Sequence, residues 1–214
     1  WSELNKTMQA QIKKKDTYKM GIDTLFNLRR QLMQTLVSFK EDLCREDFNA
    51  IPFINADGYH SKTIAYSIWH IFRIEDIVAH TVITEDEQVF FTGNYQVRIN
   101  SPIITTGNEL VKQQIADFSK QLNLEELYSY IFEVRESTEK ILERFSYDEL
   151  KWKIPDERKG YLKSLNVVNC DEKAIWLIDY WCSKDIRGLI QMPFSRHWIM
   201  HTEACLRIKN KIHS

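Results

Sequence analysis

Apolar residues recur every three or four positions along four long stretches of the chain, which is the spacing of amphipathic α-helices. The first stretch runs from about residue 17 to residue 40. Its apolar positions are Met20, Leu25, Leu28, Leu32, Leu36 and Phe39, and the charged residues expected on its other faces are Arg29, Arg30 and Lys40. We therefore predict a first long helix with a leucine-rich stripe facing the core.

The other three stretches predict three more long helices. Residues 61 to 84 contain no glycine or proline and are apolar at Ile64, Ile68, Ile71, Ile74, Ile77 and Val78. A third helix is expected from Asn123 to about residue 145, because Asn123 followed three residues later by Glu126 is typical of a helix N-cap. Pro193 suits the first turn of a last helix that continues nearly to the C-terminus.

The connections between these helices are expected to hold shorter elements. Residues 1–16 are polar and predict a short helix or an arm, and residues 43–56 read as a connector. Residues 85–108 are rich in turn residues, and their β-rich part, residues 89–105, predicts a small hairpin or an irregular insertion. We expect a helix over residues 109–121, and one or two short helices between residues 146 and 192, including residues 172–182.

Composition supports an all-α fold. Six glycines and four prolines in 214 residues are few, so turns should be rare and elements long. Four long amphipathic helices with two substantial connections predict a four-helix bundle with additional short helices in the connections. We expect one domain over residues 1–214, with a core that needs neither disulfides nor a structural metal.

Charge and cysteine usage exclude several classes of function. The formal net charge is -1 and the pI is about 6.7, which argues against a nucleic-acid-binding protein. We expect no signal peptide and no membrane span, because no long apolar run occurs. The four cysteines form no CxxC pair, so neither a cysteine zinc site nor a disulfide framework is indicated. These features favour a cytoplasmic protein.

Three histidines are the candidate metal ligands. His197 and His201 are four residues apart, so on a helix their side chains lie one turn apart on one face. Helical geometry puts Met200, Ala204 and Ile208 within about 60° of that face, which indicates that both histidines point inward. The same geometry makes His70 inward on the second helix, near Tyr66 and Ile74. Three neutral imidazoles can bind a metal and leave coordination positions open.

With His70 in Ser67-Ile68-Trp69-His70-Ile71 on the second long helix and the HxxxH pair on the last, the chain resembles the DinB/YfiT-like family of metal-dependent enzymes. The resemblance covers the whole chain in helix order and length. It implies a DinB/YfiT-like four-helix bundle in which His70, His197 and His201 hold a divalent metal ion, nickel or zinc being favoured. One departure concerns the subfamily, because many members follow the second histidine with Arg-Gly-Gln, whereas His201 is followed by Thr202-Glu203-Ala204.

The resemblance also implies a function. It favours a thiol-dependent S-transferase or a hydrolase that uses a low-molecular-weight thiol or water, acts on a small-molecule substrate and forms a homodimer. The alternative is a non-enzymatic protein that binds a metal or small ligand in a stress response, since no carboxylate base or serine nucleophile accompanies the histidines. The histidine pattern by itself implies only a metal with open positions.

Other residues are weaker candidates. Tyr66, Ile74, Met200 and Cys205 are expected to line the pocket, although Cys205 also suits a small buried core position. Glu75 and Asp76 lie off the His70 face and are expected to be solvated. The remaining histidines read as loop or surface residues, namely His60, His80 and His213.

Overall fold

The structure, a computed structural model, describes the backbone of residues 1–214 and every side chain except that of Tyr59. Over these residues the protein is all-helical and has no β-strand, and its one β-type pairing is an isolated bridge between Lys153 and Asp185. No described helix combines the length and the apolar character that crossing a lipid bilayer requires.

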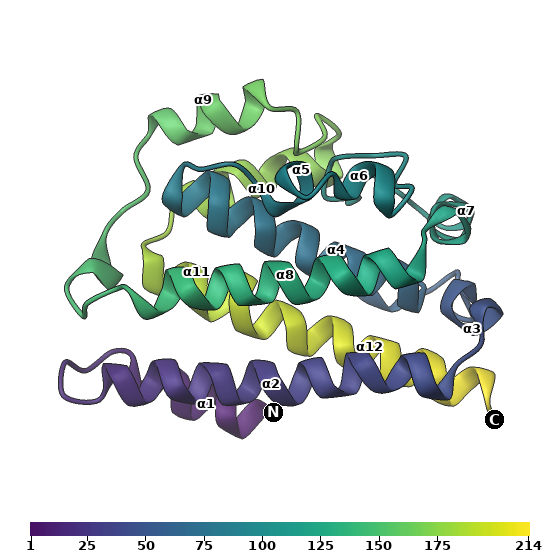
Figure 1. Cartoon of the computed structure of the whole chain (residues 1–214), viewed down its shortest axis with the longest axis horizontal. Coiled ribbons are helices and arrows are strands. Elements are labelled where there is room, and N and C mark those ends of the chain that lie inside the picture. The colour runs from purple at the N-terminus through teal and green to yellow at the C-terminus, as the bar shows by residue number, and fades with distance from the viewer.

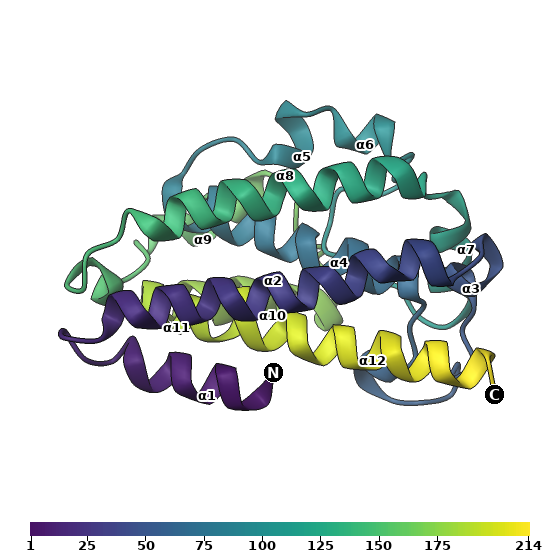
Figure 2. The ribbon, with the colours of Figure 1, turned by 60° about the horizontal axis from the view of Figure 1, so that its bottom comes forward.

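Four helices form the centre of the molecule. They are α2 (Tyr18–Asp42), α4 (Ile64–Asp76), α8 (Leu124–Glu143) and α12 (His197–Ile212). Helices α2 and α8 lie in front of α4 and α12 in Figure 1, and the turned view of Figure 2 separates α12 from α2. Helix α1 (Ser2–Gln11) folds back along the first part of α2.

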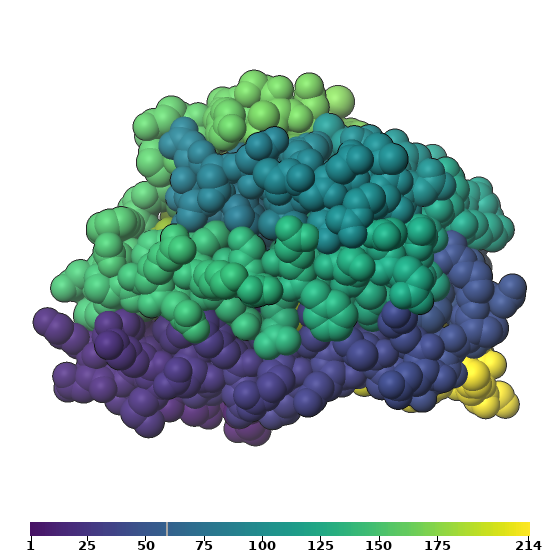
Figure 3. Space-filling model, in the orientation of Figure 1, coloured from purple at the N-terminus to yellow at the C-terminus, as the bar shows by residue number. Residues whose placement is uncertain are grey.

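The connections carry short helices. The connection between α2 and α4 holds α3 (Arg45–Asn49) and the 3₁₀ turn η1 (Gly58–His60). Between α4 and α8 the chain forms the π-helical segment η2 (Ile77–Thr84), then α5 (Val89–Thr92), α6 (Tyr95–Arg98) and α7 (Gln113–Gln121). Before α12 it forms η3 (Glu149–Lys151), α9 (Glu157–Ser164), α10 (Glu172–Cys182), α11 (Ile186–Gln191) and the π-helical segment η4 (Met192–Arg196). Figure 3 shows α2, α8 and the 85–108 connection as successive bands across one face.

Several predicted elements are confirmed. Helix α2 buries the expected leucine stripe, and α10 has the bounds predicted for it. The Asn123 side chain caps α8 by accepting a hydrogen bond from the backbone N–H of Glu126 at 3.3 Å. Pro193 lies in the first turn of η4, which leads directly into α12. The helical period therefore predicted the long elements and two of their beginnings.

Other predictions were wrong in part. The β-rich window contains α5 and α6 instead of a hairpin. The helix expected over residues 109–121 begins only at Gln113, because Lys112 has φ 48° and ψ −120° and so breaks the helix. Met20 is 55% exposed although it fits the period of α2. Local pattern does not reveal which part of an amphipathic stripe a neighbouring element will cover.

Helix α4 is enclosed on all sides, and every one of its residues is buried. It packs against α8 and α12, and α3, α5 and α7 cover its remaining sides. The expectation that Glu75 and Asp76 are solvated was therefore wrong, since both side chains are fully buried. Buried carboxylates are stable only when they are paired and hydrogen-bonded, and both of these are.

Glu75 forms a buried ion pair with Arg29 of α2. The guanidinium group donates to both carboxylate oxygens, at 2.7 Å and 2.9 Å, and both side chains have no solvent exposure. Trp198 of α12 donates its indole N–H to the same carboxylate at 2.7 Å. Arg29 also donates to the Phe194 carbonyl in η4 and to Glu139 of α8. The expectation that Arg29 lies on an outer face was wrong, because its side chain reaches inward to join α2, α4, α8 and α12.

A second buried network lies at the end of α4. The Asp76 carboxylate accepts hydrogen bonds from the backbone N–H groups of Val89 and Phe90 and from the Tyr130 hydroxyl, at 2.9, 2.8 and 2.9 Å. Arg73 lies 3.6 Å from the same carboxylate. This arrangement anchors the beginning of α5 to α4 and α8, so the connection after α4 returns across the core.

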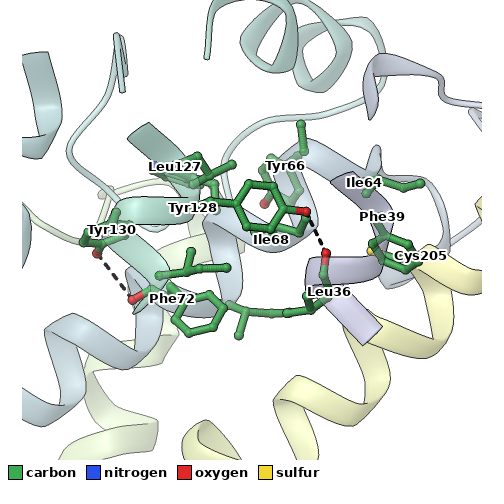
Figure 4. Packing of buried hydrophobic residues seen from close by; sticks show 14 of the residues in the cluster. Leu36, Phe39, Ile64, Tyr66, Ile68, Phe72, Leu127, Tyr128, Tyr130 and Cys205 are labelled. Carbon is green, nitrogen blue, oxygen red and sulfur yellow. Dashed lines mark hydrogen bonds between the residues drawn. The ribbon is translucent and has the colours of Figure 1, made fainter. Parts of the chain in front are cut away.

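The hydrophobic core consists of two clusters on either side of this polar layer. One includes Leu32 and Phe72, and the other includes Leu25 and Ile77. Figure 4 shows how the first cluster joins helices through tyrosine hydroxyls: Tyr128 donates to the Leu36 carbonyl at 2.7 Å. The ionic side chains thus lie across the middle of the core.

We predict that Glu75→Gln lowers the free energy of unfolding by about 3 kcal/mol, because it removes the fully buried counter-ion of Arg29 and leaves only the partly exposed Glu139. Urea denaturation at pH 7 measures the change. Glu136→Gln, which removes an exposed ion pair to Lys140 on α8, is the matched control and should unfold like the wild type. Equal stability of the two variants would contradict the role assigned to the buried pair.

Candidate metal centre

Three histidines from two helices meet inside the molecule. His70 lies in the second turn of α4, His197 is the first residue of α12, and His201 follows one turn later. The exposed fractions of these residues are 4%, 7% and 5%. The structure thus brings together the three residues that the sequence analysis selected, although 127 positions separate His70 from His197 (197 − 70).

The geometry of the cluster suits one metal ion. Each histidine offers a ring nitrogen, and these atoms lie within 4.8 Å of one another. The ring centroids are 4.6 to 5.1 Å apart. Three nitrogens bound to one tetrahedral ion at about 2.1 Å would be roughly 3.4 Å apart, so small rotations of the rings suffice. The group can therefore hold a metal ion.

The loop before α7 orients His70. The Nδ1–H group of His70 donates to the Thr106 carbonyl at 2.6 Å, which leaves Nε2 as the atom with a free lone pair. Tyr66, one turn earlier, stacks on the imidazole at 5.3 Å and donates its hydroxyl to the Gly107 carbonyl at 2.9 Å. Gly107 has φ 75°, and a Cβ there would lie 2.8 Å from Trp69, so this turn requires glycine.

The polar layer of the core orients the other two histidines. Trp198, between them in sequence, is fully buried, and its indole bonds to Glu75. This contact fixes the rotation of α12 and so directs His197 and His201 toward α4. The Nδ1 atom of His197 is buried without a hydrogen-bond partner among the described residues, which is the state expected of a ring nitrogen available for a ligand.

The surroundings keep all three imidazoles neutral. Burial lowers the pKa of His70 to about 4, and it also lowers the pKa values of His197 and His201 well below 6.5. The neighbouring histidines add a smaller electrostatic contribution for the last two. Since only a neutral imidazole has a free lone pair, the histidines are in the protonation state that metal binding requires at pH 7.

A pocket of about 450 Å³ leads to the histidines. Tyr66, Ile74 and Met200 line it, whereas Cys205 does not. Cys205 is fully buried in the core beside Phe39, and burial raises its thiol pKa to about 12. A neutral thiol in that position is a core residue and a poor metal ligand.

Two features of the pocket were missed by the sequence analysis. One wall comes from α10 and consists of Trp176, Leu177, Tyr180 and Trp181. Lys62, just before α4, is the one formally charged side chain among the described lining residues, and it lies over the Tyr66 ring at 5.2 Å. Burial lowers the pKa of this lysine. The apolar character of α10 is visible in the sequence, but nothing there indicates that α10 faces α4.

The prediction that His80 lies on the surface was wrong, because this residue of η2 is only 6% exposed. Its ring contacts Asp86 at 2.7 Å and the Ser137 hydroxyl of α8 at 3.0 Å. This resembles a hydrolytic triad, but Glu133 and Glu136 flank Ser137 in the adjoining cavity and would repel a developing oxyanion. We therefore assign His80 to joining η2 and α8. His60 and His213 lie at a turn and at the C-terminus, as predicted.

Comparison with models of protein families gives no match to this chain, and comparison with curated proteins gives none either. The assignment of the site therefore depends on its geometry.

We predict that the metal-free protein loses stability as the pH falls from 7 to 5. Each site histidine has a folded-state pKa below its unfolded value of about 6.5, so the unfolded chain takes up protons first. Each contributes a loss of about 2 kcal/mol over this range. In urea denaturation with a chelator, His197→Gln should reduce the loss by about that amount. A loss of stability in His197→Gln as large as that of the wild type would contradict the prediction.

Proposed function

We propose that this protein is a divalent-metal-dependent enzyme of the DinB/YfiT-like type, acting as a thiol-dependent S-transferase or as a hydrolase. The observation that carries the proposal is the convergence of His70, His197 and His201 at a pocket of about 450 Å³. Pockets of this size accommodate small molecules, and a ligand in this one would lie next to the three ring nitrogens.

The residues present fit a metal ion. His70 is held by the Thr106 carbonyl in the manner of metal-binding histidines, whose second ring nitrogen usually donates to a carbonyl or carboxylate. The buried Nδ1 atom of His197 is without a partner among the described residues. No described residue lining the pocket is a carboxylate, so three neutral imidazoles would leave the charge of a divalent ion uncompensated. Such a site favours an anionic further ligand.

The reaction chemistry divides between the ion and the chain. A divalent ion held by the three histidines would supply Lewis acidity, which lowers the pKa of a thiol or of water toward neutrality. The chain positions the substrate and excludes water, since aromatic and aliphatic side chains form most of the pocket wall. Burial raises the pKa of Tyr66, whose hydroxyl holds the Gly107 carbonyl, so Tyr66 maintains the loop that orients His70.

Helix order supports the family proposal. The candidate ligands come from α4 and α12, the second and the last of the four long helices, and α2 and α8 complete a four-helix bundle in this interpretation. The residues after His201 depart from the Arg-Gly-Gln pattern, so a thiol transferase and a hydrolase are both retained. A homodimer and a cytoplasmic location stay predictions of the resemblance.

One observation favours a non-enzymatic binding protein. The described pocket lining contains no carboxylate, serine or cysteine, so no protein base or nucleophile stands beside the histidines. A protein that only holds a metal or a small ligand would need none. The distinction is experimental, because an enzyme must exchange ligands at the site and a storage protein need not.

We predict that the untagged protein binds one Zn²⁺ or Ni²⁺ ion per chain in isothermal titration calorimetry. His201→Ala should weaken the affinity at least tenfold, because it removes one of three ligands. His213 is an exposed histidine near the C-terminus, so the control variant His213→Ala should bind the metal ion with the affinity of the wild type. Circular dichroism should show unchanged helix content after chelation, since the core has no need of the ion. An unchanged affinity in His201→Ala would place the metal elsewhere, and loss of helix would make it structural.

We predict that a low-molecular-weight thiol produces a sulfur-to-metal charge-transfer band in the cobalt-substituted protein, because the site favours an anionic ligand. His70→Ala should abolish the band. A spectrum unchanged by millimolar thiol, with cobalt still bound, would contradict the S-transferase interpretation. Water-dependent hydrolysis or simple binding would then be favoured.

A further inference from the structure

A second cavity adjoins the histidine pocket. It also measures about 450 Å³ and shares Gly58, Lys62 and Asn108 with the pocket. Its walls come from the loop before α4, the loop before α7 and the first turn of α10. We call this cavity the lysine groove, after the three lysines that line it: Lys62, Lys112 and Lys173.

The charge of the lysine groove is unbalanced. Asp57 is the one carboxylate among its described lining residues, against three ammonium groups. None of the three lysines forms an ion pair within the part of the chain that the structure describes. Lys62 stands at the junction of groove and pocket and contacts the Tyr66 ring. Because it is partly buried without a counter-ion, a bound anion would stabilise its charged form.

The backbone at Lys112 gives an independent indication. Its φ of 48° and ψ of −120° lie in a region that side chains disfavour, and glycine would adopt this conformation more readily. Lysine is nevertheless the residue that immediately precedes α7 and lines the groove here. Strained residues of this kind occur preferentially where a ligand or a reaction uses them.

The pocket beyond Lys62 has the opposite character. Trp176, Tyr180 and Trp181 line it with aromatic rings; Trp176 is 49% exposed, and Trp181 is 1% exposed and forms part of the inner wall. Aromatic walls of this type bind planar or extended apolar groups. Groove and pocket together therefore offer one apolar end and one cationic end, joined at Lys62.

We propose that the two cavities bind an elongated amphipathic anion. Its apolar end lies against the α10 wall beside the histidines, and its carboxylate or phosphate groups lie along Lys62, Lys112 and Lys173. The proposal names the substrate class of the histidine pocket. It rests on the proposed function in one respect only, namely that the apolar end of the anion is the end that reacts. The anion selectivity comes from the lysines and does not require a metal, so it can be tested without one.

The experiment measures binding of matched probes by isothermal titration calorimetry, with chelator-treated protein at low salt. 2-Naphthoate should bind at least tenfold more tightly than the neutral 2-naphthalenemethanol, which has the same apolar body. In Lys62→Gln this preference should fall below threefold, and Lys62→Arg should retain it. Lys13→Gln makes the same change of net charge on the turn between α1 and α2, outside both cavities, and should leave the preference intact.

A longer pair of probes tests the rest of the groove. N-(2-naphthoyl)-Glu-Glu-amide should bind at least tenfold more tightly than its Gln-Gln counterpart. The double variant Lys112→Gln/Lys173→Gln should reduce this ratio below threefold and leave the affinity for 2-naphthoate unchanged. Lys112→Gly should raise the urea midpoint, because glycine relieves the backbone strain, while it weakens binding of the Glu-Glu probe.

Several outcomes would overturn the proposal. They are equal affinities of the acid and the alcohol for the wild type, no binding of either probe, and a loss in Lys13→Gln as large as that in Lys62→Gln. A metal titration of the same preparations distinguishes this failure from failure of the proposed function. Metal binding without anion selectivity would overturn only the substrate class, and anion selectivity without metal binding would overturn only the metal-dependent function.

Discussion

The ion pair between Arg29 and Glu75 is the interaction on which the rest of the structure depends. Both charges are fully removed from water, so the fold is stable only if α2 and α4 meet at this point with both hydrogen bonds formed. Trp198 donates to the same carboxylate, which extends the requirement to α12. This contact also fixes the position of the candidate site, because His197 is next to Trp198 in sequence and His70 lies on the same helix as Glu75. Stability of the core and placement of the candidate ligands thus have a common origin.

The sequence was sufficient to predict the long helices and the inward direction of the three histidines, because both follow from helical periodicity. It misplaced Arg29, Glu75 and Asp76 for a physical reason. Periodicity assigns charged residues to solvent, but α4 has no solvent face, and the partner of Glu75 lies 46 residues away in sequence. Long-range pairing of this kind leaves no local pattern. His80 was misplaced for the same reason, since Ser137 on another helix completes its hydrogen bonds.

The connections, which the sequence described least well, provide much of the candidate site. Thr106 and Gly107 lie in the 85–108 segment and hold His70 and Tyr66, while α10 provides the aromatic wall. Helices α4 and α12 supply the ring nitrogen atoms, and the connections supply much of the depth, polarity and charge of the cavity beside them. Functional differences between proteins with this arrangement are therefore expected to arise in the connections, where loops tolerate change more readily than packed helices.

The π-helical turn before α12 has a consequence for the evolution of this site. A π turn contains one residue more than the α-helical turn it replaces, and in η4 the His197 N–H reaches back to the Met192 carbonyl. One residue corresponds to about 100° of rotation in an α-helix. Deleting a single residue between Met192 and Arg196 would keep every side chain of α12 and yet turn its two imidazoles away from α4. The direction of the two candidate ligands thus depends on the extra residue of the π turn as well as on the contact of Trp198 with Glu75, and losing one codon here would disturb both.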